Sequence, residues 1–298
     1  MNYLVFDIGG SSIKYALMNE EAKFLDKGKV PTPSVGKIAL YETLASIFAQ
    51  YEDVAGIGIS LPGVIDPVKG YAYTSGALNY YNDTYFVKEL EDYVHVPVTI
   101  GNDAKCAANA EIGFGVLQDV DDAVVVVLGT GIGGCLIKDH KVIIGKHFSA
   151  GEASVIMTDY RKEYLYDHLW CNRSGIVGLL AHVQEALGTN DQYSGEEIFA
   201  MANKGNEKVI AGIDAFTYEI AVQLFNIHTW FDSEKIAIGG GISAQPLLFE
   251  LLNKNVDGIY EELKKYYYPC SKPVVVKCQY GNDANLVGAL YQHLTRTK

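Results

Sequence analysis

One arrangement occurs twice in this chain and restricts its fold more than any other feature. Residues 3–18 and 123–138 each contain a short apolar run, a glycine-rich turn and a second run that returns. Runs of this length bounded by glycine predict β-strands. Asp119-Val120-Asp121-Asp122, just before the second copy, predicts a turn between domains. We therefore predict a duplicated α/β fold with a cleft between two domains, residues 1–118 plus 282–298 and residues 119–281.

The rest of the chain alternates apolar strands with helical stripes. A buried strand is predicted from Val54, and helices are predicted over residues 170–187 and 211–230. A further helix is predicted from Ala244, after a strand that ends in three glycines. A final helix follows Asn282-Asp283, and we expect that pair only to cap it. Such alternation is typical of an α/β protein.

Composition narrows the class of protein. Of 298 residues, 49% are apolar and 20% charged, which suits a folded protein with a sizeable core. The net charge of -12 argues against nucleic-acid and anionic membrane partners. Apolar runs are too short to span a bilayer, and no signal segment follows Met1. Five cysteines without paired metal-like spacing complete the case for a cytoplasmic protein.

The stretch Gly101-Asn102-Asp103 joins an apolar strand to a helix rich in small residues. This junction leaves the carboxylate of Asp103 at the carboxyl edge of the predicted sheet, where ligands of open α/β folds bind. Asp103 is therefore a candidate catalytic base. The alternative is that Asn102 and Asp103 only cap the helix, because both residue types are good N-caps.

Three glycine-rich turns could approach an anion or a planar ligand closely. Gly9-Gly10-Ser11 lies between Asp7 and Lys14 and resembles a phosphate-gripping hairpin, although such turns also close ordinary hairpins. Gly129-Thr130-Gly131 opens the second copy and leads into a strand, whereas a dinucleotide-binding loop must open a helix. Gly239-Gly240-Gly241 precedes a predicted helix start, a favourable place for a ligand.

Two further segments carry groups suited to sugars. Residues 71–85 include five tyrosines, Tyr71, Tyr73, Tyr80, Tyr81 and Tyr85, whose rings combine apolar area with a polar tip. The alternative is that they anchor a loop or form an oligomer contact. Glu152 follows a glycine in a loop, and by itself it is typical of a solvated loop residue rather than of a ligand.

The order of these motifs is more specific than any one of them. Asp7-Ile-Gly-Gly-Ser, Gly101-Asn-Asp-Ala, Leu128-Gly-Thr-Gly-Ile-Gly-Gly, Ala150-Gly-Glu and Ile238-Gly-Gly-Gly-Ile-Ser together resemble the ROK family (repressor, open reading frame, kinase) of bacterial sugar kinases. The resemblance extends from Asp7 to the helix after Asn282. It implies a two-domain actin-like (ribonuclease H-like) ATPase fold, with the active-site cleft between the domains.

The resemblance also implies roles for individual residues. Asp103 matches the family's general base, and Asn102, Asp103 and Glu152 match its sugar ligands. ATP and Mg²⁺ are the implied cofactors, with Asp7 near the magnesium through a water molecule. The implied nucleotide-binding residues are Asp7, Gly9, Gly10, Ser11, Lys14, Thr130, Gly131, Gly240 and Gly241.

The implied reaction is transfer of a phosphoryl group from ATP to a hexose or hexose derivative at its 6-hydroxyl. Glucose, a β-glucoside and N-acetylmannosamine are the candidate substrates, and the tyrosine-rich segment could favour a bulkier glycoside. The implied assembly is a homodimer. The alternative is a non-catalytic sugar-sensing regulator. Repressors of this family carry a DNA-binding segment ahead of the kinase-like part, whereas here the first hairpin begins within ten residues of Met1.

The sequence departs from the family at its zinc site. Many members carry Gly-Glu-x-Gly-His and three clustered cysteines, whereas this chain has Gly151-Glu152-Ala153-Ser154-Val155 and only Cys171 nearby. One thiolate without histidine does not make a four-ligand structural zinc site. We therefore predict no zinc.

Overall fold

The computed structural model describes residues 1–161 and 165–296, which form two compact units. Unit 1 comprises Met1–Gln118, Ile144–Ala150 and the chain from Asn282 onward, and unit 2 comprises Asp119–Ile143 and Gly151–Gly281. The predicted domains did not anticipate that Ile144–Ala150 belong with unit 1.

Segment 144–150 is held to unit 1 by side-chain contacts. The buried Lys105 ammonium donates a hydrogen bond to the carbonyl oxygen of Ala150, and the ring of Phe148 lies 5.3 Å from that of Tyr73. These contacts explain why segment 144–150 belongs to unit 1, although the residues on both sides of it in the sequence belong to unit 2.

Unit 1 contains a five-stranded sheet in the order β3-β2-β1-β4-β7. Strands β1 to β3 form an antiparallel meander, whereas β1, β4 and β7 run parallel. Parallel neighbours require crossover connections, and α1 and α2 supply them. The strands are β1 (Asn2–Ile8), β2 (Ser12–Asn19), β3 (Phe24–Pro31), β4 (Val54–Leu61) and β7 (Val98–Asn102), with a separate pair β5 (Ile65–Asp66) and β6 (Tyr71–Ala72).

Unit 2 repeats this scheme in the order β10-β9-β8-β11-β12. Its first strand again pairs with an antiparallel hairpin partner on one side and a parallel strand on the other. The predicted duplicated α/β fold is therefore confirmed. The strands are β8 (Ala123–Leu128), β9 (Ile132–Lys138), β10 (Lys141–Val142), β11 (Lys235–Gly239) and β12 (Val275–Lys277).

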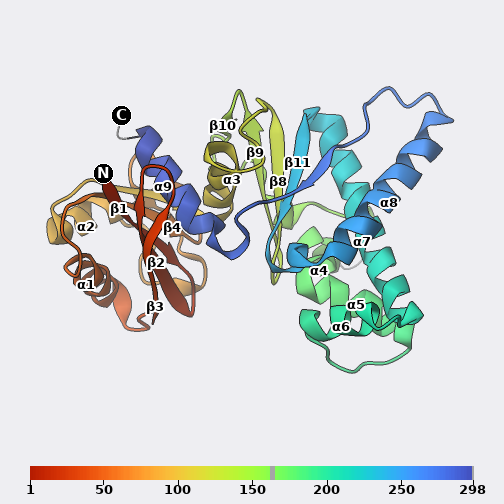
Figure 1. The fold of residues 1–298 in the computed structure, drawn as a ribbon, viewed down its shortest axis with the longest axis horizontal. Coiled ribbons are helices and arrows are strands. Elements are labelled where there is room, and N and C mark those ends of the chain that lie inside the picture. The colour runs from red at the N-terminus through yellow and green to blue at the C-terminus, as the bar shows by residue number, and fades with distance from the viewer. Residues whose placement is uncertain (162–164, 297–298) are drawn as a thin grey trace. The chain divides into compact units, whose positions relative to one another are not determined.

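Helices cover the sheets of both units (Figure 1). Those of unit 1 are α1 (Gly36–Phe48), η1 (Gly76–Leu78), α2 (Phe86–Val94), α3 (Asp103–Gly113), η5 (Gly281–Asp283, which starts at the unit boundary) and α9 (Ala284–Arg296). Those of unit 2 are η2 (Ala153–Val155), η3 (Leu165–His168), α4 (Trp170–Arg173), α5 (Gly175–Leu187), α6 (Gly195–Asn203), α7 (Glu207–Phe231), η4 (Gly241–Ala244) and α8 (Pro246–Lys264). No helix of the described residues has the length and apolar content needed to cross a bilayer.

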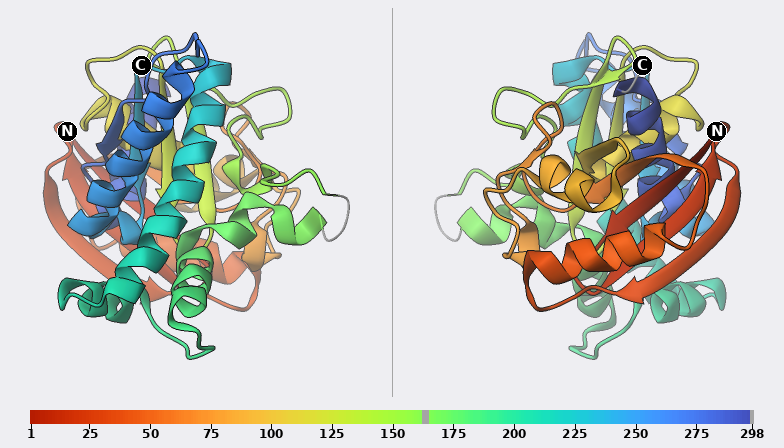
Figure 2. Two further views of the ribbon diagram at one scale, coloured as in Figure 1. Left: turned by 90° about the vertical axis from the view of Figure 1, so that its right-hand side faces the viewer. Right: turned by 90° about the vertical axis from the view of Figure 1, so that its left-hand side faces the viewer.

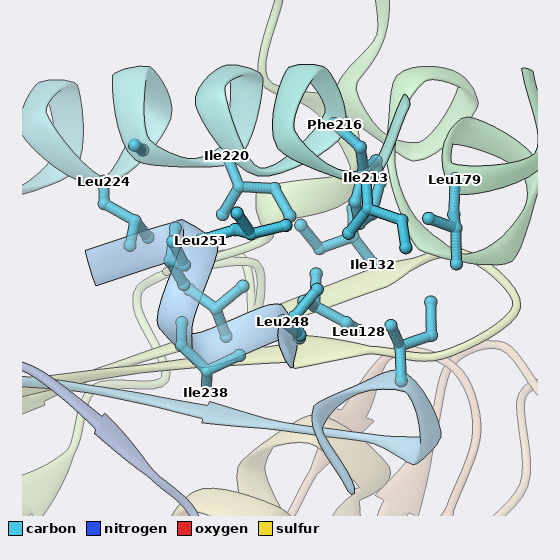
Figure 3. Close-up of a cluster of buried hydrophobic side chains, with 14 of the residues drawn as sticks. Leu128, Ile132, Leu179, Ile213, Phe216, Ile220, Leu224, Ile238, Leu248 and Leu251 are labelled. Atoms are coloured by element: carbon cyan, nitrogen blue, oxygen red, sulfur yellow. The ribbon is translucent and has the colours of Figure 1, made fainter. Parts of the chain in front are cut away.

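Each unit has its own core. In unit 1, Leu40, Tyr41 and Leu44 of α1 and Phe86 and Leu90 of α2 pack on buried residues of the sheet. Figure 2 (right) shows these two helices on one face of that sheet. In unit 2, α7 and α8 lie side by side on the sheet (Figure 2, left), and their apolar side chains meet those of β8, β9 and β11 (Figure 3).

Three of the predicted helices have different bounds, and the helix predicted over residues 211–230 starts four residues earlier, at Glu207. The helix predicted over residues 170–187 is interrupted, because Ser174 is extended and Gly175 has a φ of +65°, so α4 ends and α5 begins there. The helix predicted from Ala244 starts at Pro246, a residue suited to the first helical position because it has no N–H to satisfy. The residues before it form the 3₁₀ turn η4.

Helix α9 packs on α3 and on the sheet at backbone distance (Figure 1). A Cβ atom added at Gly288 would lie 1.6 Å from the carbonyl oxygen of Cys106, and one at Gly101 would lie 2.3 Å from Oε1 of Gln292. Glycine at position 288 is therefore a condition of this backbone contact, whereas a side chain at position 101 would displace the amide of Gln292.

Polar side chains are buried where α9 crosses β7. His293 is 1% exposed, and its Nδ1 lies 3.1 Å from the hydroxyl of Thr99. The amide of Gln292 donates to the carbonyl oxygen of Ile100 at 2.5 Å. Burial lowers the pKa of His293 to about 4, because the charged imidazolium would lose its hydration.

This burial predicts a pH-dependent stability of unit 1. The unfolded state, with a His pKa of about 6.5, binds a proton that folded His293 rejects, so stability is complete above pH 6.5 and falls towards pH 4. We expect a loss of about 2–3 kcal/mol between pH 7 and pH 4 from this residue. This loss can be measured by hydrogen exchange of the α9 backbone amides at several pH values, after correction for the pH dependence of the intrinsic exchange rates.

The matched variant is His293→Gln, which is neutral throughout this range. It should lose less protection than the wild type between pH 7 and pH 4. Equal losses in both proteins would show that His293 is not the titrating group.

Candidate active site

The carboxyl edge of the unit 1 sheet brings together three of the predicted segments. Strand register aligns Asp7 of β1 with Ser60 of β4, and Ser60 with Gly101 of β7. Since neighbouring strands lie about 4.8 Å apart, the backbones of Asp7 and Gly101 are roughly 10 Å apart. The turn after Asp7 and the start of α3 after Gly101 therefore share one edge.

At the start of α3 the capping role belongs to Asn102. Its side-chain oxygen accepts a hydrogen bond from the backbone N–H of Lys105 at 3.3 Å, and its amide donates to the carbonyl oxygen of Gly63 at 3.0 Å. Asp103 is the first helical residue, and its Oδ1 accepts from the N–H of Ala104 at 2.8 Å. The structure thus assigns the helix cap to Asn102, whereas the sequence left open whether Asn102 or Asp103 caps the helix.

The negative charge of Asp103 affects the pKa values of two buried side chains, Cys106 and Tyr81, and that of Asp7 affects Cys106. Burial raises the pKa of the Cys106 thiol, and the charges of Asp103 and then Asp7 raise it further. Burial likewise raises the pKa of the Tyr81 hydroxyl, with further contributions from Tyr80 and Asp103. Cys106 and Tyr81 are fully buried, and with raised pKa values both stay neutral near pH 7.

The first glycine turn is fixed from the end of β3. The Thr32 hydroxyl donates to the carbonyl oxygen of Gly9 at 2.6 Å, and its N–H donates to that of Ser11 at 3.2 Å. Gly10 and Ser11 are exposed at the tip. A turn held from behind with an exposed tip suits the binding of an anion by backbone N–H groups.

Asp7 is oriented by residues from both ends of the chain. Its Oδ2 lies 3.5 Å from the Lys14 ammonium, and its Oδ1 accepts from the amide of Asn285 at 2.9 Å. Carboxylate oxygens are the ligands that Mg²⁺ prefers, usually with retained waters. The residues present therefore fit a magnesium held near Asp7 through water.

The segment before α9 does more than the predicted capping. The carbonyl oxygen of Asn282 accepts from Lys14 at 3.4 Å, and Asp283 forms an ion pair with Lys27 at 2.7 Å. Together with Asn285, these residues join the C-terminal helix to the first hairpin. The interpretation of Asn282-Asp283 as a cap alone is too narrow.

In unit 2, the second glycine turn supports the start of helix α5. Gly129, Thr130 and Gly131 connect β8 to β9, and the N–H of Ile176 donates to the carbonyl oxygen of Gly129 at 3.0 Å. A Cβ at Gly175 would lie 2.6–2.8 Å from the carbonyl oxygens of all three turn residues.

The third glycine run lies beside the same strand. A Cβ at Gly240 would lie 2.2 Å from the carbonyl oxygen of Leu128, the last residue of β8, whereas one at Gly241 would meet open space. Thr130, Gly131, Gly240 and Gly241 are thus brought to one edge of the unit 2 sheet.

Glu152 is an exposed residue at the start of η2. Its Oε1 accepts from the hydroxyl of Ser154 at 2.6 Å, so Ser154 orients the carboxylate. Ser154 stands where many family members have glycine before the zinc-binding histidine. In the described part of the chain, no three His, Cys, Asp or Glu side chains are grouped to hold a metal ion. The residues around Glu152 and Cys171 therefore do not fit the family's zinc site.

Sequence reasoning missed four supporting residues: Thr32, Ser154, Gly175 and Asn285. Only two had a usable signal. Ser174-Gly175 precedes an apolar helical stripe, as a helix start does, and Asn285 follows a second copy of the Gly-Asn-Asp motif. Thr32 acts through a tertiary contact that no local pattern encodes, whereas Ser154 contacts Glu152, only two residues away, in a segment without helix or strand periodicity.

The contact at Gly175 predicts a specific instability. Gly175→Ala should lower the free energy of unfolding of unit 2 by about 2–4 kcal/mol, since it combines a positive φ with a clash against the turn. Fluorescence of the buried Trp170 during urea unfolding measures it.

The control is Gly188→Ala at the other end of α5. Gly188 also has a positive φ, +70°, but a Cβ there would meet nothing within 4 Å. We expect a loss of only about 1 kcal/mol. Equal losses for the two variants would contradict the proposed packing of α5 on the turn.

Comparisons with known proteins identify the family of this chain. A β-glucoside kinase from Klebsiella pneumoniae is 28% identical over 98% of this chain and 95% of its own. An N-acetyl-D-glucosamine kinase from Vibrio vulnificus is 30% identical over 98% and 99%. The crystal structure of a ROK family protein from Streptococcus pneumoniae in complex with sucrose superimposes with a TM-score of 0.89, at 30% identity, covering 100% and 99%. The ROK family model matches residues 3–296, and the chain belongs to the ROK family.

Proposed function

We propose that this chain transfers the γ-phosphate of ATP to the 6-hydroxyl of a hexose or hexose derivative, with Asp103 as general base. The chain is an ATP-dependent carbohydrate kinase, as are its named relatives. The observation that supports Asp103 as the base is the division of roles at α3. Asn102 caps the helix, which leaves Asp103 at the sheet edge that also carries the first glycine turn.

The chemistry requires little beyond positioning and charge. A sugar hydroxyl is a weak nucleophile, and a carboxylate that accepts its proton typically contributes about 10²–10⁴-fold. Backbone N–H groups of Gly10 and Ser11, with Lys14, would bind phosphate oxygens, and Gly9, whose own N–H donates to the carbonyl oxygen of Ser12 at 3.0 Å, would shape the turn around them. Magnesium, when bound with ATP, neutralises phosphate charge, and Asp7 would hold it through water.

In unit 2, we assign the remaining nucleotide contacts to the two neighbouring glycine turns. Thr130 and Gly131 would bind phosphate, and the open space beside Gly241, next to Gly240, would admit the adenosine side. Glu152, oriented by Ser154, would accept hydrogen bonds from sugar hydroxyls, and Asn102 would add a further contact through its remaining amide hydrogen.

A coupled assay of ADP release tests this function. The panel should include glucose, methyl β-glucoside, cellobiose, N-acetylglucosamine and N-acetylmannosamine. Sugar-dependent ADP release with at least one of them is expected. Its absence across the panel would favour the alternative of a sugar-sensing regulator.

Asp103→Asn tests the assigned base. It should lower kcat by about 10²–10⁴-fold, because the amide cannot accept the hydroxyl proton. Stability should change by less than about 1 kcal/mol, since Asn102 provides the cap and an amide oxygen at position 103 can still accept the hydrogen bond from the N–H of Ala104. Steady-state kinetics and urea unfolding measure both. Full turnover in this variant would refute the assignment.

Asn102→Ala is the matched variant for the cap. It should destabilise the protein by about 0.5–2 kcal/mol, unlike Asp103→Asn. A stable Asn102→Ala beside an unstable Asp103→Asn would reverse the two roles.

We also propose that the enzyme works without zinc. The donor set supports this, because Cys171 stands alone and Glu152 is followed by Ala153-Ser154-Val155. Plasma mass spectrometry of the dialysed protein should find well below one zinc per chain, and activity should survive a zinc-selective chelator in the presence of excess Mg²⁺. One zinc per chain after dialysis would contradict this.

A cytoplasmic homodimer is the assembly we propose. Use of ATP and free cysteines, Cys106, Cys135, Cys171, Cys270 and Cys278, support a reducing compartment. The nearly fully exposed Trp230, at 92%, supports a contact surface on unit 2. The net charge of -12 supports the absence of a nucleic-acid partner.

A further inference from the structure

A cavity in unit 2 lies outside the set of residues assigned to the proposed reaction. Its volume is about 320 Å³, within the usual range of roughly 300–1,000 Å³ for ligand sites. The walls come from the loop before α4, from α4 itself and from α7. None of the described residues that line it is one that we assign to ATP or to the sugar. The charged and amide side chains in its lining include Asp159, Arg161, Arg173, Glu219 and Gln223.

Two ion pairs belong to this lining. Nε of Arg161 donates to Oδ2 of Asp159 at 2.8 Å, and Nη2 of Arg173 donates to Oε1 of Glu219 at 2.8 Å. The Arg161 guanidinium holds the pKa of Asp159 at about 2. Burial alone would raise the pKa of Glu219, but hydrogen bonds from His182 and Arg173 lower it. Both carboxylates are therefore ionised near pH 7, and each is balanced by an arginine.

The hydrogen-bonding capacity that remains at the cavity is mainly that of donors. Arg173 uses only Nη2 for Glu219, and its Nε and Nη1 have no acceptor among the described residues. Gln223 is 6% exposed, and its Oε1 accepts from the amide of Asn226 at 3.1 Å. The amide hydrogens of Gln223 likewise have no acceptor in the described part of the chain. Because a buried donor without an acceptor is costly, an occupant rich in acceptor oxygens would stabilise the site.

The lining as a whole fits a phosphorylated sugar. A phosphate monoester offers three acceptor oxygens to arginine, whose planar N–H groups match phosphate geometry. The rings of Tyr218, which is 50% exposed, and of the buried Trp170 offer apolar faces to a sugar ring. The remaining lone pairs of Asp159 and Glu219 can accept hydrogen bonds from sugar hydroxyls. One class of compound thus uses the donors, the acceptors and the aromatic rings together.

Helix α4 connects this cavity to two segments that we assign to the substrates. The backbone N–H of Trp170, at the start of α4, donates to the carbonyl oxygen of Ile156 at 2.8 Å. Ile156 immediately follows η2, the turn that Glu152 caps. Gly175, two residues past the end of α4, lies against the second glycine turn. A ligand that fixes α4 would therefore also restrain the loop of Glu152 and the second glycine turn.

We propose that this cavity is a second ligand site, which binds a hexose monophosphate. The choice of this compound rests on the proposed kinase function, because the reaction would release it as product. Its phosphate group binds to the remaining N–H groups of Arg173 and to the amide of Gln223, and its ring lies against Tyr218.

Trp170 provides a direct test, because Trp170 and Trp230 are the only tryptophans in the sequence. Trp230 is 92% exposed, so Trp230→Phe leaves Trp170 as the single indole of a folded protein. Glucose 6-phosphate should change the fluorescence of Trp170 along a saturable curve. The change should persist when glucose and a non-hydrolysable ATP analogue saturate the proposed active site.

Arg173→Met and Gln223→Leu, made in this background, remove the donors one at a time. Each should weaken the binding of glucose 6-phosphate by about 10-fold or more, because hydrogen bonds to a charged group are strong. Their urea unfolding curves show whether each variant is folded.

Lys254→Met is the matched control. It also removes a cation from an ion pair with α7, since Lys254 lies 2.9 Å from Asp214, but neither residue lines the cavity. The affinity for glucose 6-phosphate should equal that of the Trp230→Phe background.

Two further ligands test the class of compound. Inorganic phosphate should bind more weakly than glucose 6-phosphate, because it leaves Tyr218 without a partner. Glucuronate, which carries a carboxylate in place of the phosphate, should also bind more weakly. Glucuronate binding as tight as that of glucose 6-phosphate would overturn the assignment to a phosphate monoester.

The outcomes separate this inference from the function on which it rests. A wild type that phosphorylates no sugar, although its Trp170 responds to glucose 6-phosphate, refutes the kinase proposal alone. An active enzyme whose Trp170 does not respond, or responds only while the active site is empty, overturns the cavity assignment alone. Equal affinities in Arg173→Met, Gln223→Leu and Lys254→Met overturn it too.

Discussion

The close packing of α9 is the interaction on which the candidate site of unit 1 depends. Gly288 allows α9 to touch the backbone of α3, and Gly101 admits the side chain of Gln292. This approach brings Asn285 at the start of α9 to Asp7. The last helix of the chain therefore orients a carboxylate seven residues from its beginning, and a residue larger than glycine at position 288 would displace both α3 and Asp7.

In unit 2, a different helix holds the glycine turn at the end of the first strand. Its glycine turn is held by the start of α5, where Gly175 lies against three carbonyl oxygens. The two units share strand order but not the helix that supports the turn. In unit 1 the turn is held by Thr32 after β3 and the neighbouring Asp7 by the start of α9, whereas in unit 2 the turn is held by the start of α5.

The sequence predicted the strands, the duplication and the family because these depend on local patterns. Apolar runs between glycine turns specify strands at residues 3–18 and 123–138 whatever their surroundings. Capping is different. Asn102 and Asp103 are both good caps, and only the hydrogen bond from Lys105 to Asn102 separates them.

Tertiary contacts explain most of what sequence reasoning missed. Thr32 supports Gly9, and Asn285 reaches Asp7, through contacts that span 23 and 278 residues. The interruption at Ser174-Gly175 was missed because apolar periodicity continues across it. The role of residues 144–150 depends on the bond from Lys105 to Ala150, which no local pattern specifies.

Segment 144–150 has a consequence for the connectivity of the protein. The chain passes from one unit to the other after residues 118, 143, 150 and 281. Neither unit is therefore a continuous stretch that truncation could isolate. A fragment ending at Gln118 would lack α9 and would leave the faces of α3 and β7 on which α9 packs exposed to water. A single cut at any of these crossings divides unit 1 between two fragments, which only non-covalent packing could then hold together.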